Sequence, residues 1–124
     1  MLLAINPTFA QQKAAKKEIG LQLYSVREEI SKNPNFDQIL QKIAALGYTG
    51  VEAAGYKAGK FYNLSPQEFK AKVEKTGMKV LSSHATKTLS PQELASGDFS
   101  ESLKWWDECI AAHKAAGMKY IVTP

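Results

Sequence analysis

Three stretches of the sequence share one pattern: Gly47-Tyr48-Thr49-Gly50-Val51-Glu52, Gly77-Met78-Lys79-Val80-Leu81-Ser82 and Gly117-Met118-Lys119-Tyr120-Ile121-Val122. Each stretch follows an amphipathic segment and opens a short apolar run, and the pattern returns after about 30 to 40 residues, within the range of known structural repeats. Such self-similarity indicates one supersecondary unit that is used repeatedly. The unit consists of a helix, a glycine that ends it and a buried strand, which is the αβ half of a βαβ repeat.

The repeated unit predicts an α/β fold in which parallel strands alternate with helices. We expect strands at residues 19–24, 50–53, 79–84 and 119–123, and main helices at residues 36–46, 66–76 and 99–116. Four parallel strands are half of a closed eight-stranded barrel, and a complete (β/α)8 barrel takes roughly 250 residues. We therefore predict a partial TIM barrel of about four parallel strands and three main helices. Residues 1–18 are expected to be a leader and linker, and residues 19–124 the N-terminal half of the barrel.

Two near-copies of one start signal mark helix N-termini. Leu64-Ser65-Pro66-Gln67-Glu68-Phe69 and Leu89-Ser90-Pro91-Gln92-Glu93-Leu94 each place a capping serine before a proline, and a glutamate that completes a capping box. Apolar residues at helical spacing predict the stripes that face the sheet. These stripes are Phe36, Ile39, Leu40 and Ile43 in the first main helix, and Leu103, Trp106 and Ile110 in the third. Residues 25–35 and 54–63 are expected to be loops.

Composition and charge indicate an ordinary globular domain rather than a nucleic-acid-binding protein. The chain is 44% hydrophobic and 23% charged, with a formal net charge of +4. A nucleic-acid footprint needs clustered basic residues with interleaved aromatics, whereas Arg27 is the only arginine and the lysines are scattered. The single cysteine, Cys109, excludes an internal disulfide, and we expect it to be a buried, inert thiol. We expect His113, on the third main helix, to lie on the solvated surface.

The N-terminus has features of an export signal. Residues 1–5 are apolar, and Thr8-Phe9-Ala10 resembles a small-x-small cleavage site before Gln11. A basic N-terminal region is missing and the apolar run is short, so the expectation is a clipped signal peptide and a periplasmic or secreted protein. The alternative is a leader with chance similarity and a cytoplasmic location. The sequence contains no apolar run of about 20 residues that could span a membrane.

Polar residues fall at the ends of the first three expected strands, where parallel α/β folds gather ligands. If the leucines of the first strand meet the helices, alternation directs Gln22 and Tyr24 to the opposite, inner face. The same argument directs Glu52 inward and places Ser82 and His84 on the inner face. Carboxylates accept hydrogen bonds from paired hydroxyls, and imidazole can move a proton near neutral pH, so the set suits a polyhydroxylated ligand.

Each of these residues also has a structural interpretation. Tyr24 could be core packing with its hydroxyl at the rim, and a histidine at a strand end is often structural. An inward-facing Glu52 is costly unless it is paired, which favours a functional role. Glu52 and His84 supply at most two metal ligands, fewer than a catalytic divalent site needs, so we assign no metal ligand within this chain.

Three blocks resemble the sugar phosphate isomerase/epimerase group of xylose-isomerase-like TIM barrels. They are Ile19-Gly20-Leu21-Gln22-Leu23-Tyr24-Ser25-Val26-Arg27, Leu46-Gly47-Tyr48-Thr49-Gly50-Val51-Glu52 and Ser82-Ser83-His84. The resemblance covers about residues 19–124. The second block is shared more widely in the superfamily, including hydroxypyruvate isomerases and type IV endonucleases.

The resemblance implies a (β/α)8 barrel with a divalent metal, commonly Mn, Mg, Zn or Co. Its implied chemistry is proton abstraction next to a carbonyl, in which the metal polarises the carbonyl and carboxylates move the proton. The family's principal metal ligands lie on later strands and have no counterpart in this chain. Tyr24, Glu52 and His84 match the substrate side of the site. In the endonuclease branch a third-strand histidine binds metal, so His84 as a metal ligand is a second choice.

The resulting prediction is the N-terminal fragment of a metal-dependent sugar (phosphate) isomerase/epimerase that is weakly active or inactive alone. Tyr24, Gln22, Glu52 and His84 are the expected substrate-binding residues, and Glu52 and His84 the expected catalytic ones. The expected partner is a sugar or sugar phosphate. One alternative is a non-catalytic half-barrel that forms a homodimer through its open strand edge. A second is a keto-sugar or glycoside lyase or hydrolase of the same superfamily, and a third, disfavoured by the charge, is an endonuclease.

Overall fold

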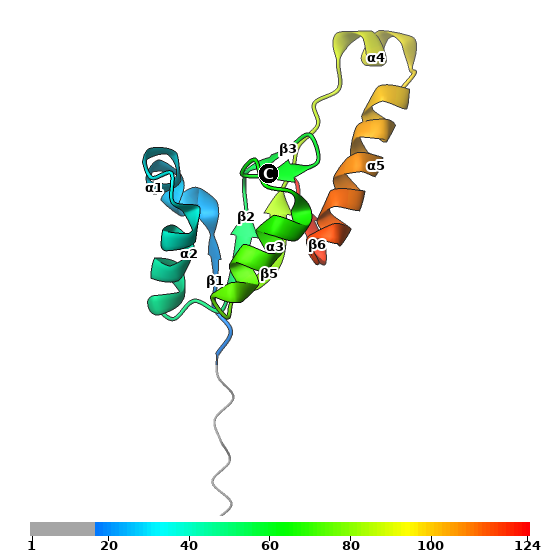
Figure 1. The fold of residues 1–124 in the computed structure, drawn as a ribbon. Coiled ribbons are helices and arrows are strands. Elements are labelled where there is room, and N and C mark those ends of the chain that lie inside the picture. Colours follow the sequence, from blue (N-terminus) through cyan, green and yellow to red (C-terminus); the bar gives the residue numbers. More distant parts are fainter. Residues whose placement is uncertain (1–16) are drawn as a thin grey trace, which may run out of the picture.

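A parallel four-stranded sheet forms the centre of the computed structural model, which describes residues 17–124 (Figure 1). The strands are β1 (Gly20–Gln22), β2 (Gly50–Ala53), β5 (Lys79–His84) and β6 (Tyr120–Val122), in the order β1-β2-β5-β6. All three pairings are parallel. The predicted α/β fold is confirmed. Nearly all of the predicted leader, including the cleavage-site motif, lies outside the described residues.

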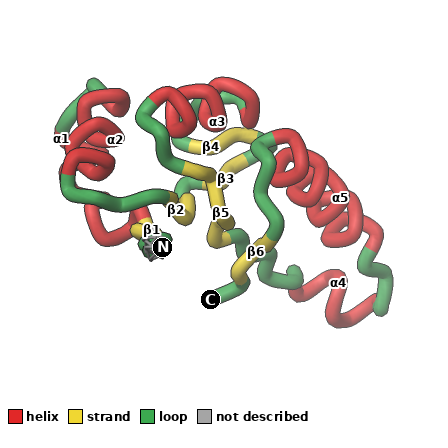
Figure 2. The backbone as a smooth tube through the Cα atoms, turned by 90° about the horizontal axis from the view of Figure 1, so that it is seen from below, coloured by secondary structure: helices red, strands yellow, loops and turns green. Residues whose placement is uncertain are grey.

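Three main helices cover one face of the sheet in an arc (Figure 2). They are α2 (Phe36–Ala45), α3 (Pro66–Lys75) and α5 (Ser100–Ala115), each within two residues of the expected bounds. Both predicted capping boxes are present, at Ser65 with Glu68 and at Ser90 with Glu93. The second opens α4 (Pro91–Ser96), which Gly97 ends in the left-handed conformation with φ 71°. No helix among residues 17–124 is long and apolar enough to cross a membrane.

The expected loops contain regular structure that the sequence patterns did not predict. The first strand is shorter than expected, because the chain leaves the sheet at Leu23 and forms a 3-10 helix, η1 (Leu23–Val26), and then α1 (Arg27–Lys32). The second expected loop holds a small antiparallel hairpin, β3 (Tyr56–Lys57) and β4 (Lys60–Phe61). Its two-residue turn has positive φ at both Ala58 and Gly59, as the right-handed twist of a tight hairpin requires. An alanine in that conformation gives little sequence signal for a turn.

The core lies between the sheet and the three helices. The largest fully buried side chains include one from the start of η1, one from β2, one from β4 and three from the main helices. They are Leu23, Val51, Phe61, Leu40, Phe69 and Val73. The rings of Phe61 and Phe69 lie 5.4 Å apart. The hairpin therefore acts as part of the core, because it carries an aromatic residue into the space between α3 and α5.

The predicted inner stripe of α5 is wrong. Leu103 and Ile110 are 63% and 42% exposed, whereas Cys109 and Ala112 face the core. His113, expected on the surface, is only 2% exposed and packs 5.0 Å from the ring of Phe61. The physical reason is the hairpin: its aromatic residues already fill the space under α5, so only smaller side chains fit on the inner face of that helix. The prediction of a buried Cys109 thiol is confirmed, and burial raises its pKa.

A bulge in β5 changes which residues face the inner side of the sheet. Val51 pairs with Val80, but Glu52 pairs with Ser82, so Leu81 is an extra residue in β5. Strict alternation would place Leu81 on the face opposite Ser82, yet it lies on the inner face, over Gly20 of β1 and Gly50 of β2. A Cβ atom added at Gly50 would lie 2.8 Å from Cγ of Leu81, and one at Gly20 would lie 2.8 Å from its Cδ1. The leucine thus fills a layer that two glycines leave open.

Replacing Gly50 by alanine should destabilise the protein by about 1–3 kcal/mol, the usual cost of overpacking. The added Cβ meets the branch point of Leu81, so the leucine must leave its rotamer or the backbone must shift. Urea unfolding measures the change. Gly20→Ala should cost less, because only the end of the leucine side chain approaches it. Adding Leu81→Ala to Gly50→Ala should remove most of the Gly50→Ala penalty, and strictly additive effects would contradict the packing described.

Acid should lower stability through His113. Its Nδ1 donates to the carbonyl oxygen of Cys109 at 2.7 Å, its buried Nε2 has no partner among the described residues, and burial lowers its pKa from 6.5. Below about pH 6.5 His113 binds a proton in the unfolded chain but stays neutral in the folded chain. The free energy of unfolding therefore decreases as the pH is lowered. The loss in urea midpoint between pH 7.5 and 5.5, both near the titration range of histidine, should be reduced in His113→Leu. Glu29→Gln, on the exposed surface of α1, is the control that should keep this loss.

Candidate active site

Four polar side chains from three adjacent strands meet on the inner face of the sheet. Gln22 is the last residue of β1, Glu52 lies in β2, and Ser82 and His84 lie in β5. The register places Gln22 beside Glu52 and Glu52 beside Ser82, so the three strands bring these side chains to the same level. We call Gln22, Glu52, Ser82 and His84 the polar quartet. It lies toward the carboxyl ends of the strands, on the face opposite to the covering helices.

Direct hydrogen bonds join the quartet around the carboxylate of Glu52. Ser82 Oγ donates to Glu52 Oε2 at 2.5 Å, and Gln22 Nε2 donates to Glu52 Oε1 at 2.7 Å. His84 Nε2 lies 3.1 Å from Glu52 Oε1 and 2.8 Å from Gln22 Nε2. The side chains of Glu52 and His84 are 22% and 25% exposed, so the group is largely sheltered but can be reached from the inner face.

The surroundings of Glu52 favour its ionised form. Partial burial by itself would raise the pKa of the carboxyl group, but hydrogen bonds from Ser82 and Gln22, together with His84, outweigh it and lower the pKa. An inward carboxylate with several donors is therefore a stable anion and a strong acceptor. His84 Nε2 lies between the Gln22 amide nitrogen and Glu52 Oε1, so it accepts from the amide in one tautomer of the ring and donates to the carboxylate in the other.

Tyr24 is not part of the quartet, contrary to the expectation that strand alternation would align it with Gln22. The chain has already left the sheet at Leu23, and Tyr24 lies in η1 with 54% of its surface exposed. The guanidinium of Arg27 lies 4.5 Å from the centre of the Tyr24 ring and donates to the Tyr24 carbonyl oxygen at 3.1 Å. Sequence reasoning did not place Arg27 near the site. Its spacing of three residues from Tyr24 is typical of a helical turn, but the segment was expected to be a loop.

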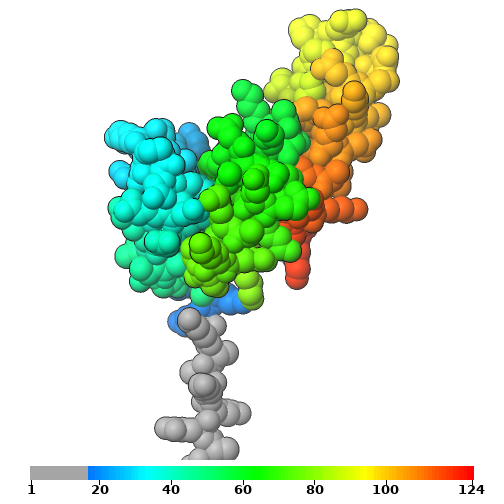
Figure 3. All heavy atoms as spheres, in the orientation of Figure 1, coloured from blue at the N-terminus to red at the C-terminus, as the bar shows by residue number. Residues whose placement is uncertain are grey.

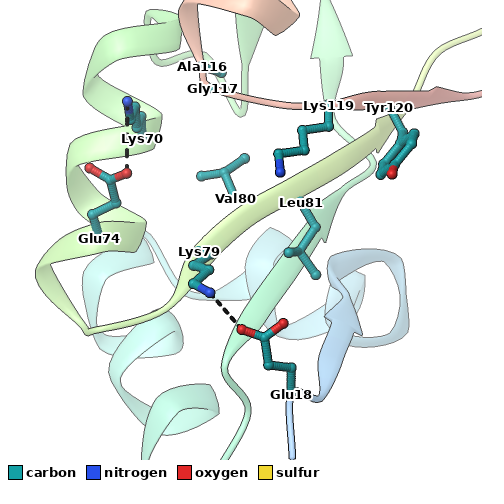
Figure 4. A pocket seen from close by; sticks show the side chains of 10 residues that line it. All are labelled: Glu18, Lys70, Glu74, Lys79, Val80, Leu81, Ala116, Gly117, Lys119 and Tyr120. Carbon is teal, nitrogen blue, oxygen red and sulfur yellow. Dashed lines mark hydrogen bonds and ion pairs between the residues drawn. The ribbon is translucent and has the colours of Figure 1, made fainter.

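A cavity of about 410 Å³ lies at the opposite end of the strands, between the start of β5 and the ends of α3 and α5 (Figure 4). Lys79 in its wall pairs with Glu18 at 2.6 Å, and Lys70 lies 3.9 Å from Glu74. Each basic side chain of these two pairs is thus matched by a carboxylate. This cavity is separate from the polar quartet, which lies on the open inner face of the sheet.

The residues present do not make a complete metal site. Within residues 17–124, no group of three or more histidine, cysteine, aspartate or glutamate side chains could hold a metal ion. Glu52 and His84 are the only two such side chains in the quartet, and catalytic divalent sites usually take three or four protein ligands. No step of the chemistry derived from these residues runs through a metal.

Two solved structures that this chain resembles in fold are described as sugar phosphate isomerase/epimerase proteins. One from Parabacteroides distasonis superposes with a TM-score of 0.75 at 27% identity, over 91% of this chain. A second from the same organism gives 0.74 at 30% identity, over 87% of this chain. This chain has the fold of a xylose isomerase-like TIM barrel. The predicted resemblance and the predicted partial barrel are both confirmed, and the chain spans only 40% and 41% of the length of those two barrels.

Solved xylose isomerase-like barrels of lower sequence identity resemble this chain in fold alone. A xylose isomerase domain-containing protein from Salmonella typhimurium matches with a TM-score of 0.60 at 13% identity, and the match covers 88% of this chain and 37% of that protein. Comparison with protein-family models finds no match, and comparison with curated proteins finds none either. The partial barrel places its polar quartet at the strand ends where TIM barrels carry their active sites.

Stability should depend on the ionisation of Glu52 in acid. Because the folded-state pKa is lowered, the stabilisation is complete above the unfolded value of 4.5 and is lost as pH falls through the folded pKa. Glu52→Gln should therefore show a smaller fall in urea midpoint below pH 4.5 than the unchanged protein. Glu29→Gln on the exposed surface of α1 is the matched control and should leave the fall intact. Equal falls in all three proteins would contradict the hydrogen bonding of the quartet.

Proposed function

We propose that the polar quartet is the part of a sugar (phosphate) isomerase/epimerase active site that this chain carries. The observation that supports the proposal most is the direct bonding of Gln22, Glu52 and His84 across three strand ends, at 2.7 to 3.1 Å. Solved structures that resemble most of the chain at 27% and 30% identity are described as sugar phosphate isomerase/epimerase proteins. Since the chain spans about two fifths of their length, the activity of a complete barrel is part of the proposal.

The quartet offers complementary groups to a polyhydroxylated ligand. The Glu52 carboxylate can accept hydrogen bonds from two neighbouring hydroxyls, and these hydroxyls would replace the present donors, Ser82 and Gln22. The amide of Gln22, once released, can donate to a ligand oxygen. Low exposure of the carboxylate strengthens such charge-assisted bonds. The quartet would thus bind and orient a sugar without large rearrangement of the strands.

His84 is the proposed proton carrier. Its Nε2 lies 2.8 Å from Gln22 Nε2 and 3.1 Å from Glu52 Oε1. A proton taken from a carbon next to a carbonyl would reside on Nε2, where the adjacent carboxylate stabilises the imidazolium that forms. Returning that proton to the neighbouring carbon, while the hydroxyl proton passes to the former carbonyl oxygen, gives isomerisation, and returning it to the opposite face of the same carbon gives epimerisation. Glu52 is proposed to position the ring and the substrate hydroxyls during this transfer.

Tyr24 and Arg27 are proposed to form the rim of the site rather than its floor. The stacked pair lies on η1 and at the start of α1, directly after the strand that carries Gln22. An exposed guanidinium suits a phosphate or carboxylate group on the substrate.

Because of the family resemblance, the proposal includes a divalent metal ion in the complete barrel. Its remaining ligands would come from outside residues 17–124. Elimination chemistry on keto-sugars is the alternative reaction for the same residues.

Ligand binding tests the proposal directly. A panel of aldoses, ketoses and their phosphates is titrated into the chain while backbone amide shifts are followed by NMR. We expect shifts in residues 20–23, 50–53 and 82–85, and at least about tenfold weaker binding in Glu52→Gln, since a buried charged acceptor is worth about 1.5–3 kcal/mol. Glu29→Gln should bind like the unchanged protein. Shifts confined to the cavity at the other end of the strands would refute the proposed site.

A further inference from the structure

One leucine covers the inner face of three adjacent strands just below the polar quartet. A Cβ atom added at Gly20 would lie 2.8 Å from Cδ1 of Leu81, and one added at Gly50 would lie 2.8 Å from its Cγ and 3.0 Å from its Cδ2. Leu81 belongs to β5, and the bulge that makes it an extra residue turns it to this face. A single isobutyl group therefore fills positions at which β1 and β2 carry no side chain.

The leucine lies one layer below the carboxylate and the amide of the quartet. The register pairs Gly20 with Gly50 and Gln22 with Glu52. Residues two apart in a strand share a face, and this spacing advances the strand by about 7 Å. Gln22 and Glu52 therefore stand directly above the two glycines that Leu81 covers. Leu81 is the apolar floor beneath their polar groups.

The same side chain separates the quartet from the cavity at the other end of the strands. Leu81 lines that cavity together with Lys79 and Tyr120 (Figure 4). In Figure 3 the atoms of α3 and of the hairpin lie over the middle of the sheet. A ligand therefore approaches the quartet and Leu81 from the opposite, inner face of the sheet.

Closure of a barrel would leave this floor in place. TIM barrels fill their interior with layers of side chains that come from different strands. The contacts of Leu81 with Gly20 and Gly50 lie within β1, β2 and β5. Side chains from the strands that complete a barrel would therefore join this layer beside the leucine, because the space over the two glycines is already filled.

We propose that Leu81 determines which ligands fit the sugar site proposed above. It supports the carbon-bound hydrogens of the ligand, while Glu52 accepts hydrogen bonds from its hydroxyls. This role rests on the proposed function, since it requires a sugar at Glu52.

The two kinds of surface on a sugar match a carboxylate above an apolar floor. Hydroxyls surround the edge of a sugar, and carbon-bound hydrogens cover its faces. Hydroxyls turned toward Glu52 would take the place of its present donors. A hydroxyl or phosphate turned toward Leu81 would lose its hydrogen bonds to water and gain none. The floor therefore favours ligands that direct C–H groups, or the methyl group of a deoxy sugar, toward the start of the strands.

Methyl NMR tests the contact directly. The chain is labelled at its leucine methyl groups, and D-glucose, 6-deoxy-D-glucose, D-glucose 6-phosphate and D-fructose are added in separate titrations. We expect nuclear Overhauser effects between the Leu81 methyls and carbon-bound hydrogens of each probe that shifts the amides of residues 50–53. If these amides shift and the Leu81 methyls show no such effect, the proposed floor is refuted and the proposed function is retained. If no probe shifts these amides, both fail.

Substitution tests the energetic role of the floor. Leu81→Ala should weaken binding of the probes by about tenfold, because the sugar would lose apolar contact with about two carbon atoms. Leu46→Ala makes the same change at a leucine that is 78% exposed, and should bind like the unchanged protein. Adding Gly50→Ala to Leu81→Ala returns a methyl group to the floor and should restore part of the affinity. Circular dichroism checks that each variant folds, and a folded Leu81→Ala with unchanged affinity would overturn the proposal.

A polar floor tests specificity separately from affinity. Leu81→Asn keeps a similar side-chain shape but offers hydrogen bonds, so it should change the order in which the probes bind, in favour of those with a hydroxyl or phosphate at the floor. Leu46→Asn is the matched control and should keep the order of the unchanged protein. An unchanged order in a folded Leu81→Asn variant would make Leu81 a packing residue only and would contradict its role in specificity.

Discussion

One face of β2 is apolar and packs against the helices, whereas the other face carries a carboxylate. The rest of the structure depends on this division. Val51 and Ala53 are completely buried against the helices, while Glu52 between them faces the inner side of the sheet. Because side chains alternate along a strand, a slip of one residue would move the carboxylate into the core and both apolar residues out of it. The parallel pairing of β2 with β1 and β5 thus fixes the hydrophobic core and the polar quartet together.

The inner face of the sheet is divided into an apolar layer and a polar layer. Toward the start of the strands, Leu81 covers Gly20 and Gly50. Toward their ends, Glu52 accepts hydrogen bonds from both neighbouring strands. The bulge in β5 makes this division possible, since it brings Leu81 and Ser82 to the same face. The polar groups are thereby confined to the strand ends, where the several donors to the Glu52 carboxylate support a role in binding a polar ligand.

The hairpin β3–β4 connects the site side of the molecule with the flank of α5. Tyr56 and Phe61 fill the space under this helix and leave room on its inner face only for small residues and the His113 ring. The larger apolar residues of α5 are consequently turned outward. The same packing therefore accounts for the buried histidine and for the exposure of Leu103 and Ile110 on the outer side of α5.

The sequence by itself determined the architecture, because the signals that specify it are local. Gly47, Gly77 and Gly117 each follow a main helix with positive φ, serine capping boxes begin α3 and α4, and two-residue alternation within β2 directs Glu52 inward. The meeting of Gln22, Glu52 and His84 could be anticipated for the same reason, since parallel register aligns strand ends.

Only the tertiary structure decided the orientation of α5, the position of Tyr24 and the side on which Leu81 lies. Two rows of residues on α5 have the same helical period. Which row faces the core depends on contacts with aromatic residues about 50 positions earlier in the chain, and no sequence pattern encodes those contacts. The turn of the chain at Leu23 and the extra residue in β5 likewise follow from packing between strands. Periodicity identifies which residues share a face, but what lies opposite that face is a property of the folded chain.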